Sequence, residues 1–533
     1  MTSAWGPGSD RTARPRLLGE LGERLAIEGR IRGNDSTRPD DAFTVITGIA
    51  DDSRRVERSN LFVAVPGLRA DGHDFVEEAL RRGAAAVVVE HPVVGLAGSV
   101  VQVVVDSGAK ALASAAAWWF GDPSQALAVV GVTGTNGKTT TSFLAEAALE
   151  AVGWPTGLIG TIGIRVGRDL RRNEVPNTTP GALALQGLLR EMVDVGEQAA
   201  VIETSSHGLA ADRVASVAYD AAIFTNLSHE HLDFHGTFEA YRAAKLSLFE
   251  RLPVRAKDGR PGIGVVNADD AAATRFEAAT RQAGARVVTY GLGDRADVRL
   301  RSVEAGAASS RLVADAAGRD IAIDLRIGGR FNARNALAVV ALAVGWDLDL
   351  ERVAAGLASL AGVPGRLEAV SRGQPFDVIV DYAHTSGSLD AVARELHELV
   401  AARGGRVLSV FGASGERDIG KRPLMGEAAA RWSHLVVVTE DDSRNENPGS
   451  IYEAVAKGAE LAGKRRGEDL LVIADRREAI AEAFGRARPG DVVLIAGKGH
   501  ETWNVGPSGP EPWSDRGAAE ELLGAMGFEE PSR

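Results

Sequence analysis

Cysteine is absent from all 533 residues, which excludes disulfide bonds and metal sites built on thiolates. Long apolar runs are absent as well. The most apolar region, residues 84–105, is interrupted by a glutamate, a histidine and a proline at 90–92, so two strands explain it better than a membrane span. The first 16 residues contain no apolar core of a signal peptide. We therefore expect a cytoplasmic protein without membrane insertion.

The chain also lacks an excess of positive charge. It has 60 Lys and Arg against 72 Asp and Glu, and its formal net charge is −12. A nucleic-acid-binding face needs basic side chains that displace counterions from phosphates, so we expect no nucleic-acid partner. The length exceeds that of one compact core and favours about three domains.

The order of the apolar segments predicts an α/β protein. Helix-like and strand-like segments alternate up to a turn cluster at 121–124. The last part of the chain has five short apolar runs that each end in polar residues, which indicates a parallel sheet covered by helices on both faces. We predict a first α/β domain at 1–123, a central domain with a parallel sheet at 124–362 and a Rossmann-like domain at 363–533.

The stretch G-V-T-G-T-N-G-K-T-T at 131–140 connects an apolar strand to a helix-like segment. Gly134, Gly137, Lys138 and Thr139 have the spacing of a phosphate-binding loop, in the variant G-x-x-G-K-T. In such a loop backbone N–H groups surround phosphate oxygens, the lysine adds a positive charge and the threonine binds magnesium. A glycine-rich turn without a ligand is the alternative, but the lysine, the threonine and the strand all agree with phosphate binding. The motif predicts a nucleotide and not a reaction.

Two further strands end in side chains that suit a metal ion. The run A-A-V-I-E-T ends at Glu203, whose carboxylate would bind magnesium or orient water beside the phosphate loop. An ordinary surface glutamate is the alternative. The run A-A-I-F-T-N leads to three histidines within residues 229–235. Histidine clusters often indicate zinc, but magnesium is already implied and cysteine is absent, so we favour one histidine on a second magnesium ion.

Lys245 occupies a slot on the apolar face of a helix predicted at 237–252, in register with Tyr241 and Leu248. A lysine in such a position usually extends its ammonium group to solvent. A desolvated lysine instead has a lowered pKa, and its neutral amine can react with carbon dioxide to form a carbamate, an anionic ligand for magnesium. These residues alone leave both interpretations open.

Taken together, the motifs resemble those of the Mur ligase family of peptidoglycan synthesis, and most closely those of the members that add the third residue of the stem peptide. The resemblance covers nearly the whole chain. The motifs are D-S-R at 52–54, A-D-G-H at 70–73, the phosphate loop at 131–140, N-T-T-P at 177–180, E-T-S-S-H at 203–207, H-L-D-F-H-G at 231–236, Y-R-A-A-K at 241–245, F-N-A-R-N-A at 331–336, P-G-R-L-E at 364–368, D-Y-A-H at 381–384, G-E-R-D-I-G-K-R-P at 415–423 and G-K-G-H-E at 497–501.

This resemblance implies a three-domain enzyme whose first domain binds a UDP-sugar, whose second is a phosphate-loop ATPase and whose third brings the amino acid. ATP would phosphorylate the D-glutamate carboxylate of UDP-MurNAc-L-Ala-D-Glu, and the amine of a diamino acid would attack the acyl phosphate. A carboxylate is a poor acyl donor, so activation is needed, and magnesium ions can neutralise the phosphates. We expect a monomer that contributes to cell-wall synthesis, cell shape and cell division.

The resemblance also implies roles for individual residues. The ATP-binding set is Gly134, Thr135, Asn136, Gly137, Lys138, Thr139, Thr140, Asn332, Arg366 and Asp381. The substrate-binding set is Asp52, Ser53, Arg54, Asn177, Thr178, Thr179, Ser205, Arg213, Arg417, Asp442, Arg444, Gly497 and Glu501. The metal set is Thr139, Glu203, His231 and a carbamylated Lys245, and the catalytic set is Lys138, His231 and Lys245.

The acceptor amino acid stays open at this point. Family members that take meso-diaminopimelate have D-N-P-R where this chain has D-D-S-R at 441–444. Arg444 would bind a distal carboxylate through two hydrogen bonds, which favours diaminopimelate. The extra charge of Asp442 would favour a side chain that ends in an ammonium group, as in lysine or ornithine.

Three other classes of function compete with this one. A phosphate-loop switch or motor would need features that the chain lacks, namely the N-K-x-D signature or long coiled-coil heptads. A non-catalytic nucleotide-binding module would leave Glu203, His231 and Lys245 unexplained. A folylpolyglutamate synthetase shares the ATPase core but would not need the D-S-R domain.

Overall fold

The computed structural model describes residues 14–32, 39–67, 70–93, 95, 100–173 and 177–529. The chain forms two compact units. Unit 1 comprises residues 1–296 and 341–349, and unit 2 comprises residues 297–340 and 350–533. The three predicted domains and their boundaries stay predictions. The prediction that the first 16 residues contain no signal-peptide core falls mostly on residues 1–13, which lie outside the described residues.

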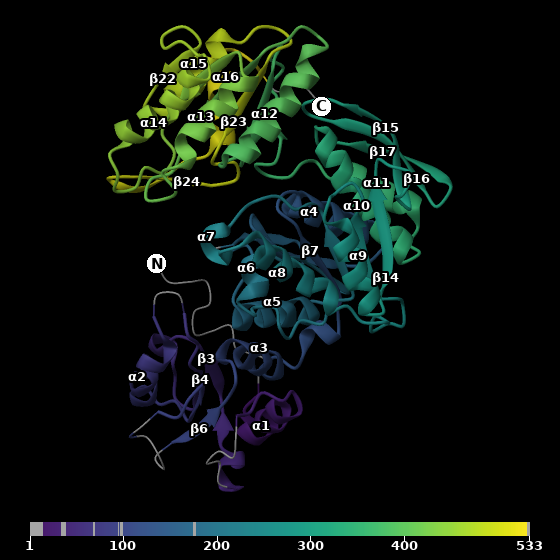
Figure 1. Cartoon of the computed structure of the whole chain (residues 1–533), viewed down its shortest axis with the longest axis vertical. Helices are drawn as coiled ribbons and strands as arrows, with labels where there is room; N and C mark the ends of the chain where they lie inside the picture. The colour runs from purple at the N-terminus through teal and green to yellow at the C-terminus, as the bar shows by residue number, and fades with distance from the viewer. Residues whose placement is uncertain are drawn as a thin grey trace. The chain divides into compact units, whose positions relative to one another are not determined.

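The N-terminal part of unit 1 contains a four-stranded parallel sheet in the order β3-β4-β5-β6 (Figure 1). The strands are β3 (Gly48–Ala50), β4 (Asn60–Val63), β5 (Ala86–Val89) and β6 (Val101–Val104), and the other elements are β1 (Arg16–Leu17), α1 (Leu18–Ile27), η1 (Pro39–Phe43), β2 (Val45–Ile46), η2 (Ser53–Arg55), η3 (Gly72–Phe75), α2 (Val76–Arg81) and α3 (Gly108–Trp119). Successive side chains of β4 enter different clusters. Leu61 belongs to the cluster of Trp118, and Phe62 belongs to that of Val76. Both faces of the sheet are therefore covered.

The central part of unit 1 contains eight consecutive strands in the order β10-β9-β8-β11-β7-β12-β13-β14. The strands are β7 (Ala128–Thr133), β8 (Thr156–Ile159), β9 (Gly163–Val166), β10 (Asp169–Arg172), β11 (Ala199–Glu203), β12 (Ala221–Phe224), β13 (Ile263–Asn267) and β14 (Arg286–Gly291). The elements between them are α4 (Lys138–Ala151), α5 (Ala182–Asp194), α6 (Ser206–Ala210), α7 (Leu232–His235), α8 (Phe238–Glu250) and α9 (Ala273–Gln282), and η4 (Pro123–Gln125) precedes β7. In this order, neighbouring strands pair in parallel from β8 through β11, β7, β12 and β13 to β14. Strand β9 pairs antiparallel with β8, and β10 pairs antiparallel with β9.

This strand order determines which chain segments meet. Strand β7 lies between β11 and β12, and all three run in the same direction. Their carboxyl ends therefore reach one edge of the sheet, which is where ligands bind in open parallel sheets. The segments that leave this edge are the predicted phosphate loop, the segment after Glu203 and the histidine-rich segment.

Unit 2 begins with three antiparallel strands in the order β15-β16-β17. They are β15 (Val298–Ala305), β16 (Ser310–Ala316) and β17 (Arg319–Leu325), and α10 (Arg330–Gly345) and α11 (Leu350–Ser359) follow in the chain. Polar and apolar residues alternate in β17, and Ile321, Ile323 and Leu325 are its buried residues. This pattern is typical of a strand with one face toward the core.

The rest of unit 2 is a six-stranded sheet in the order β18-β19-β23-β20-β21-β22. The strands are β18 (Glu368–Ala369), β19 (Asp377–Asp381), β20 (Val407–Phe411), β21 (Leu435–Val438), β22 (Leu470–Val472) and β23 (Val492–Ala496), and the other elements are α12 (Ser386–Ala401), α13 (Lys421–Trp432), α14 (Pro448–Leu461), α15 (Arg476–Arg486), β24 (Trp503–Gly506), β25 (Gly509–Pro512) and α16 (Asp515–Ala525). All neighbouring strands except β18 and β19 pair in parallel.

Helices cover both faces of this six-stranded sheet. One hydrophobic cluster joins the strands to α12, α13 and α14, and a second joins them to α15 and α16 (Figure 1). The five apolar runs of the sequence are the five parallel strands, so the prediction of a doubly covered parallel sheet is confirmed. Within the part of the chain that the structure describes, no helix combines the length and apolar character needed to span a bilayer.

Candidate functional site

The predicted phosphate loop lies between β7 and α4, as its sequence indicates. Gly134 and Gly137 have φ angles of +149° and +86°, a region that favours glycine. A Cβ at Gly134 would collide with the hydroxyl of Thr225, which follows β12. The loop is therefore packed tightly against the neighbouring strand, and only glycine fits at this position.

Lys138 closes this loop. Its Nζ donates to the carbonyl oxygen of Gly134 at 3.0 Å and to that of Thr135 at 2.8 Å. The N-cap of α4 is Gly137, which provides no side-chain cap, so the positive end of the helix dipole is directed toward the loop. A backbone loop, a helix N-terminus and a lysine together suit a phosphate group.

Glu203 is fully buried at the end of β11, so the interpretation as a surface glutamate is wrong. Its carboxylate accepts a hydrogen bond from Thr139 Oγ1 at 3.1 Å. It also accepts from the backbone N and the Oγ1 of Thr161, both at 3.0 Å. The structure thus brings together two residues of the predicted metal set, Thr139 and Glu203. Thr161 was not predicted, because only the pairing of β8 beside β11 places it there.

Lys245 is 1 % exposed in α8, so its ammonium does not extend to solvent. Its Nζ donates to the carbonyl oxygen of Gly134 at 2.7 Å and lies 4.6 Å from the centre of the Tyr241 ring. Burial holds the pKa of Lys245 well below its usual range, and the nearby charge of Lys138 lowers it further. The lowered pKa therefore favours the neutral form of this amine more than in an exposed lysine.

His231 lies at the start of α7 with a φ of +56°. Its ring centre is 4.6 Å from that of His207, which in turn is 5.5 Å from that of His235. Burial lowers the pKa of His231 to about 4, assisted by Lys138 and Lys245. Burial likewise lowers the pKa of His207 to about 4. Both imidazoles are thus neutral near pH 7, the form that can bind a metal ion.

His207 is a site residue that the sequence predictions missed. The sequence does contain a pattern that indicates it, because His207 ends the E-T-S-S-H motif, four residues after Glu203. Among the described residues, no group of three or more His, Asp or Glu side chains is arranged to hold a metal ion.

Several predicted substrate-binding residues surround Glu203. Thr179 donates from Oγ1 to the carbonyl oxygen of Glu203 at 2.7 Å, and its Oγ1 is 3.0 Å from Ser205 Oγ. Arg213 donates from Nη1 to the carbonyl oxygen of Thr179 at 3.0 Å. Thr178 shares a hydrogen bond of 3.1 Å with Thr161. The next residue toward the N-terminus, Asn177, accepts from Asn173 through its carbonyl oxygen at 3.1 Å.

The predicted D-S-R site forms the short helix η2 after β3. Arg54 Nη2 pairs with Asp52 Oδ2 at 2.7 Å, and the Arg54 side chain is 78 % exposed. Ser53 is buried and donates from Oγ to Glu78 at 2.9 Å. The guanidinium is therefore oriented by the aspartate while remaining accessible to an anionic ligand.

The three other predicted ATP contacts belong to unit 2. Asn332 is fully buried in α10 and donates from Nδ2 to the carbonyl oxygen of Gly328 at 2.8 Å. Asp381, at the end of β19, accepts from the backbone N of Leu367 at 2.8 Å, and burial raises the pKa of its carboxyl. The guanidinium of Arg366 lies over the Tyr382 ring, 4.8 Å from its centre.

Several predicted substrate-binding residues of unit 2 follow the carboxyl ends of β21 and β23. Gly497 has a φ of +110°, and a Cβ there would collide with Asp441. Lys498 is fully buried, and its Nζ lies 2.8 Å from Asp442 Oδ1 and 3.3 Å from Glu501 Oε2. These residues therefore form one charged cluster.

Two arginines of the predicted substrate-binding set, Arg444 and Arg417, differ in their environment. Arg444 has a φ of +56°, and its Nε is buried without a hydrogen-bond partner among the described residues. Arg417 is exposed on the segment that precedes α13. Its predicted role rests on the sequence alone.

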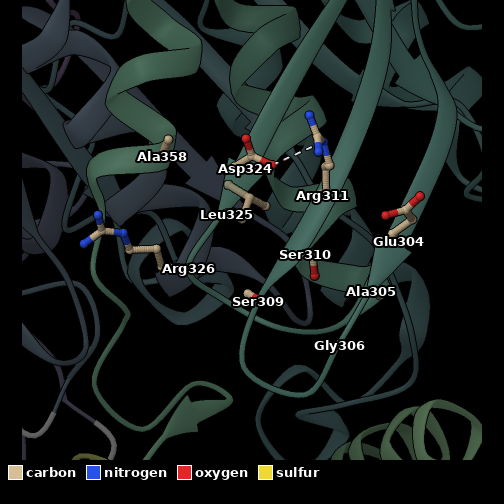
Figure 2. Close-up of a pocket in the computed structure, with 10 residues that line it drawn as sticks. All are labelled: Glu304, Ala305, Gly306, Ser309, Ser310, Arg311, Asp324, Leu325, Arg326 and Ala358. Atoms are coloured by element: carbon tan, nitrogen blue, oxygen red, sulfur yellow. Dashed lines mark ion pairs between the residues drawn. The ribbon is translucent and has the colours of Figure 1, made fainter. Parts of the chain in front are cut away.

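A pocket of about 590 Å³ lies at the turn between β15 and β16. Figure 2 shows Arg311 and Asp324, two of its lining residues, as an ion pair on neighbouring strands, with 3.4 Å between the paired atoms. Their side chains are 65 % and 71 % exposed, so this ion pair is strongly screened by water. None of the predicted site residues lines this pocket, and it is not the candidate site.

Comparison with protein families gives three matches along the chain. Residues 45–120 match the Mur ligase family, catalytic domain. Residues 132–343 match the Mur ligase middle domain, and residues 365–499 match the Mur ligase, glutamate ligase domain. The matches include the phosphate loop, the buried lysine of α8 and most of the charged cluster of unit 2.

Individual proteins resemble the chain over nearly its whole length. It is 44 % identical over 489 residues to a UDP-N-acetylmuramyl-tripeptide synthetase of Roseiflexus sp. (strain RS-1), covering 91 % of this chain and 95 % of the relative. It is 41 % identical over 478 residues to a UDP-N-acetylmuramoyl-L-alanyl-D-glutamate--2,6-diaminopimelate ligase of Geobacillus kaustophilus (strain HTA426), covering 89 % and 94 %. A solved structure of a ligase of that second name has a TM-score of 0.68 at 30 % identity, covering 96 % of this chain and all of the other.

Proposed function

The chain belongs to the Mur ligase family of ATP-dependent amide ligases, and from this premise we propose that it joins a diamino acid to UDP-MurNAc-L-Ala-D-Glu. The acceptor that we favour is meso-diaminopimelate, because several relatives that match most of the chain are named for 2,6-diaminopimelate. The single observation that carries the proposal is the buried group of Thr139, Glu203 and Lys245 at the phosphate loop. The folylpolyglutamate synthetase alternative is not favoured, since the family match extends over residues 45–120.

The phosphate loop would hold the phosphates of ATP. Gly134 to Thr140 supply backbone N–H groups and the start of α4, and Lys138 supplies the positive charge. The two hydrogen bonds of Lys138 to loop carbonyls can be exchanged for phosphate oxygens without moving the backbone. Asn332, Arg366 and Asp381 of unit 2 are the further ATP contacts that membership of the family suggests.

Magnesium fits the chemistry of two buried side chains. The hydroxyl of Thr139 and the carboxylate of Glu203 are oxygen donors only 3.1 Å apart, and a hard divalent cation prefers such ligands. When bound, magnesium neutralises charge on the phosphates. Hydrogen bonds from Thr161 and Thr139 already orient the carboxylate of Glu203.

Lys245 fits the family's carbamylated lysine on two observations. It is buried, and its pKa is held well below the usual range of lysine. Carbamylation converts the neutral amine into an anion that suits a cation near the phosphate loop. We propose His231 as a further ligand, because burial keeps its imidazole neutral.

The residues around Glu203 would position the D-glutamate carboxylate for phosphorylation. Thr178, Thr179 and Ser205 form a hydrogen-bonded group, and Arg213 is tied to it through the carbonyl of Thr179. A carboxylate held here would lie on the same sheet edge as the phosphate loop, which is the arrangement that transfer of a phosphoryl group requires. Asp52, Ser53 and Arg54 would bind the UDP-sugar part.

The amine that attacks the acyl phosphate would come from an amino acid bound in unit 2. Glu501 and Gly497 suit its ammonium group and backbone, and Arg444 and Arg417 suit carboxylates. ATP and UDP-linked sugars are made inside the cell, so we place the reaction in the cytoplasm. We further propose a monomer that serves cell-wall synthesis and, through it, cell shape and division.

The proposal is tested by phosphate release from ATP in the presence of UDP-MurNAc-L-Ala-D-Glu and magnesium. The acceptors compared are meso-diaminopimelate, L-lysine and L-ornithine. We expect stimulation by meso-diaminopimelate and formation of the UDP-MurNAc-tripeptide, identified by mass spectrometry. Release that no diamino acid stimulates would overturn the proposed function.

A further inference from the structure

Lys498 is a buried cation to which the sequence motifs assign no role. It follows β23 and its side chain is fully buried. Three carboxylates face its Nζ, at 2.8 Å for Asp442, 3.3 Å for Glu501 and 3.6 Å for Asp441. A buried lysine so surrounded is a permanent positive charge, because its neighbours favour the charged form.

The carboxylate of Asp442 contacts this lysine and the backbone of β24, one strand of the hairpin formed by β24 and β25. Its Oδ1 accepts from Lys498 Nζ and from the backbone N of Val505, both at 2.8 Å. The backbone N of Asp442 donates to Asn504 Oδ1 at 3.2 Å. Only 15 % of the Asp442 side chain is exposed. Its Oδ1 is thus paired within the protein.

The second buried cation nearby cannot replace Lys498. Arg476 forms two hydrogen bonds of 2.7 Å with Asp515, and both side chains are almost completely buried. Arg476 is therefore occupied by its own carboxylate. Without Lys498, the carboxylates of Asp441, Asp442 and Glu501 would lose the cation that faces all three of them.

Arg444 lies two residues after Asp442 and contacts the same hairpin of β24 and β25. Its backbone N donates to the carbonyl oxygen of Val505 at 2.8 Å. The hairpin therefore binds the backbone of Asp442 and that of Arg444, the residues before and after Ser443. Without its ion pair, the charge of Asp442 would act on an anionic group that approaches Arg444, since the two residues belong to one short turn.

We propose that Lys498 is a specificity-determining residue of the acceptor site. By neutralising Asp442 it removes the negative charge that would attract an acceptor side chain ending only in ammonium. Arg444 is then left to select an acceptor whose side chain carries a carboxylate. This inference rests on the proposed function, because it concerns the choice among diamino acids in the same ligase reaction.

The test compares kcat/KM for meso-diaminopimelate with kcat/KM for L-lysine in the full-length enzyme. The variants are Lys498→Met, Asp442→Asn and the double variant. The matched control is Lys464→Met. Lys464 is a partly buried lysine of unit 2, and its Nζ lies 3.6 Å from Asp469 Oδ2. It precedes β22 and therefore lies at the opposite end of the parallel strands from Lys498. The ratio of the two constants reports selectivity and cancels a uniform loss of active enzyme.

In Lys498→Met the freed charge of Asp442 should repel the distal carboxylate and attract the ammonium of lysine. We expect the selectivity ratio to fall about tenfold or more, with most of the change in the two KM values. The double variant should recover most of the wild-type ratio, since it removes the charge that was exposed. The control should keep the wild-type ratio.

Asp442→Asn keeps the test decisive if Lys498→Met does not fold. The amide has the same shape, and the inference predicts a ratio within about threefold of the wild-type ratio, because the charge of Asp442 is already cancelled. A rise of about tenfold in favour of diaminopimelate would show that Asp442 acts on the acceptor directly and would overturn the inference. An unchanged ratio in folded Lys498→Met would overturn it too. Failure of the wild type with every diamino acid would instead refute the proposed function.

Discussion

The two units each contain a fully buried lysine, and the two lysines have opposite electrostatic environments. Lys245 in unit 1 faces a carbonyl oxygen, an aromatic ring and the charge of Lys138. Lys498 in unit 2 faces three carboxylates. Burial lowers the pKa of both, but around Lys498 the charges of Asp441, Glu501 and Asp442 outweigh burial and raise it.

This difference shows that burial alone does not determine what a lysine does. Both side chains are buried, and the charge of the neighbours decides the direction of the pKa shift. The neighbours of Lys245 lower its pKa and favour the neutral amine. Lys498 remains a cation that balances its site. The expected consequences of this contrast run from a large loss of activity to a small one.

Lys245→Ala tests whether the neutral lysine is chemically required. We expect ligase activity to fall by about 1000-fold, because the anionic ligand formed on this amine would be lost. The measurement is phosphate release from ATP with all three substrates present. A short-chain carboxylate such as acetate should restore part of the activity. Lys457→Ala, an exposed lysine on α14, is the control. Activity near that of the wild type in Lys245→Ala would remove this residue from the mechanism.

Replacement of Lys498 by methionine should lower the stability of the fold, and replacement of Lys245 by methionine should raise it. Lys498→Met leaves buried carboxylates without their cation and should lower the free energy of unfolding by about 3 to 5 kcal/mol. Lys245→Met removes a buried amine whose protonation is disfavoured and should raise the free energy of unfolding. Urea denaturation followed by circular dichroism measures both. A change of the same sign in the two variants would contradict the contrast.

The pH dependence of stability sharpens the comparison further. The pKa of Lys245 is lower in the folded than in the unfolded state, so the unfolded state binds the proton more tightly as pH falls below about 10.5. The stability advantage of Lys245→Met over the wild type should therefore grow as pH falls within this window. The raised pKa of Lys498 has the reverse effect, and its stabilisation should be lost only above about pH 10.5. Denaturation midpoints between about pH 6 and about pH 10 give the slope for Lys245.

Thr161→Val should have the smallest effect of this set. It removes one of the hydrogen bonds to the Glu203 carboxylate but keeps the backbone bond from the same residue. We expect a decrease in kcat/KM for ATP of about threefold to tenfold, the value of one hydrogen bond to a charged group. Titration of magnesium should show a weaker apparent affinity.

The control for this variant is Thr141→Val in α4. The hydroxyl of Thr141 is buried and has no hydrogen-bond partner among the described residues, so its loss removes no contact to Glu203. We expect kcat/KM for ATP to stay at the wild-type value in the control. Equal decreases in the two variants would show that the hydrogen bond from Thr161 does not orient the carboxylate.

Much of the fold follows from local patterns. The five apolar runs of the C-terminal part are strands of one sheet because strands buried on both faces need continuous apolar sequence. The phosphate loop was recognised because its glycines, lysine and threonine are adjacent in the chain. Glu203 was recognised because it ends an apolar strand.

Other site residues could not be recognised in this way. Thr161 approaches Glu203 only because β8 pairs with β11. His207 lies beside His231 only because α6 and α7 follow strands that end at the same edge of the sheet. Lys498 is 56 residues from Asp442, and no local pattern predicts that they pair.

The amino-acid sequence by itself determined the α/β class, the strands, the nucleotide loop and the identity of the residues available for chemistry, because these depend on neighbours within one turn or one strand. Only the tertiary structure decided which buried lysine has a lowered pKa and which has a raised one. The pKa of a lysine depends on the groups within a few ångströms of its amine, and folding brings those groups from distant parts of the chain.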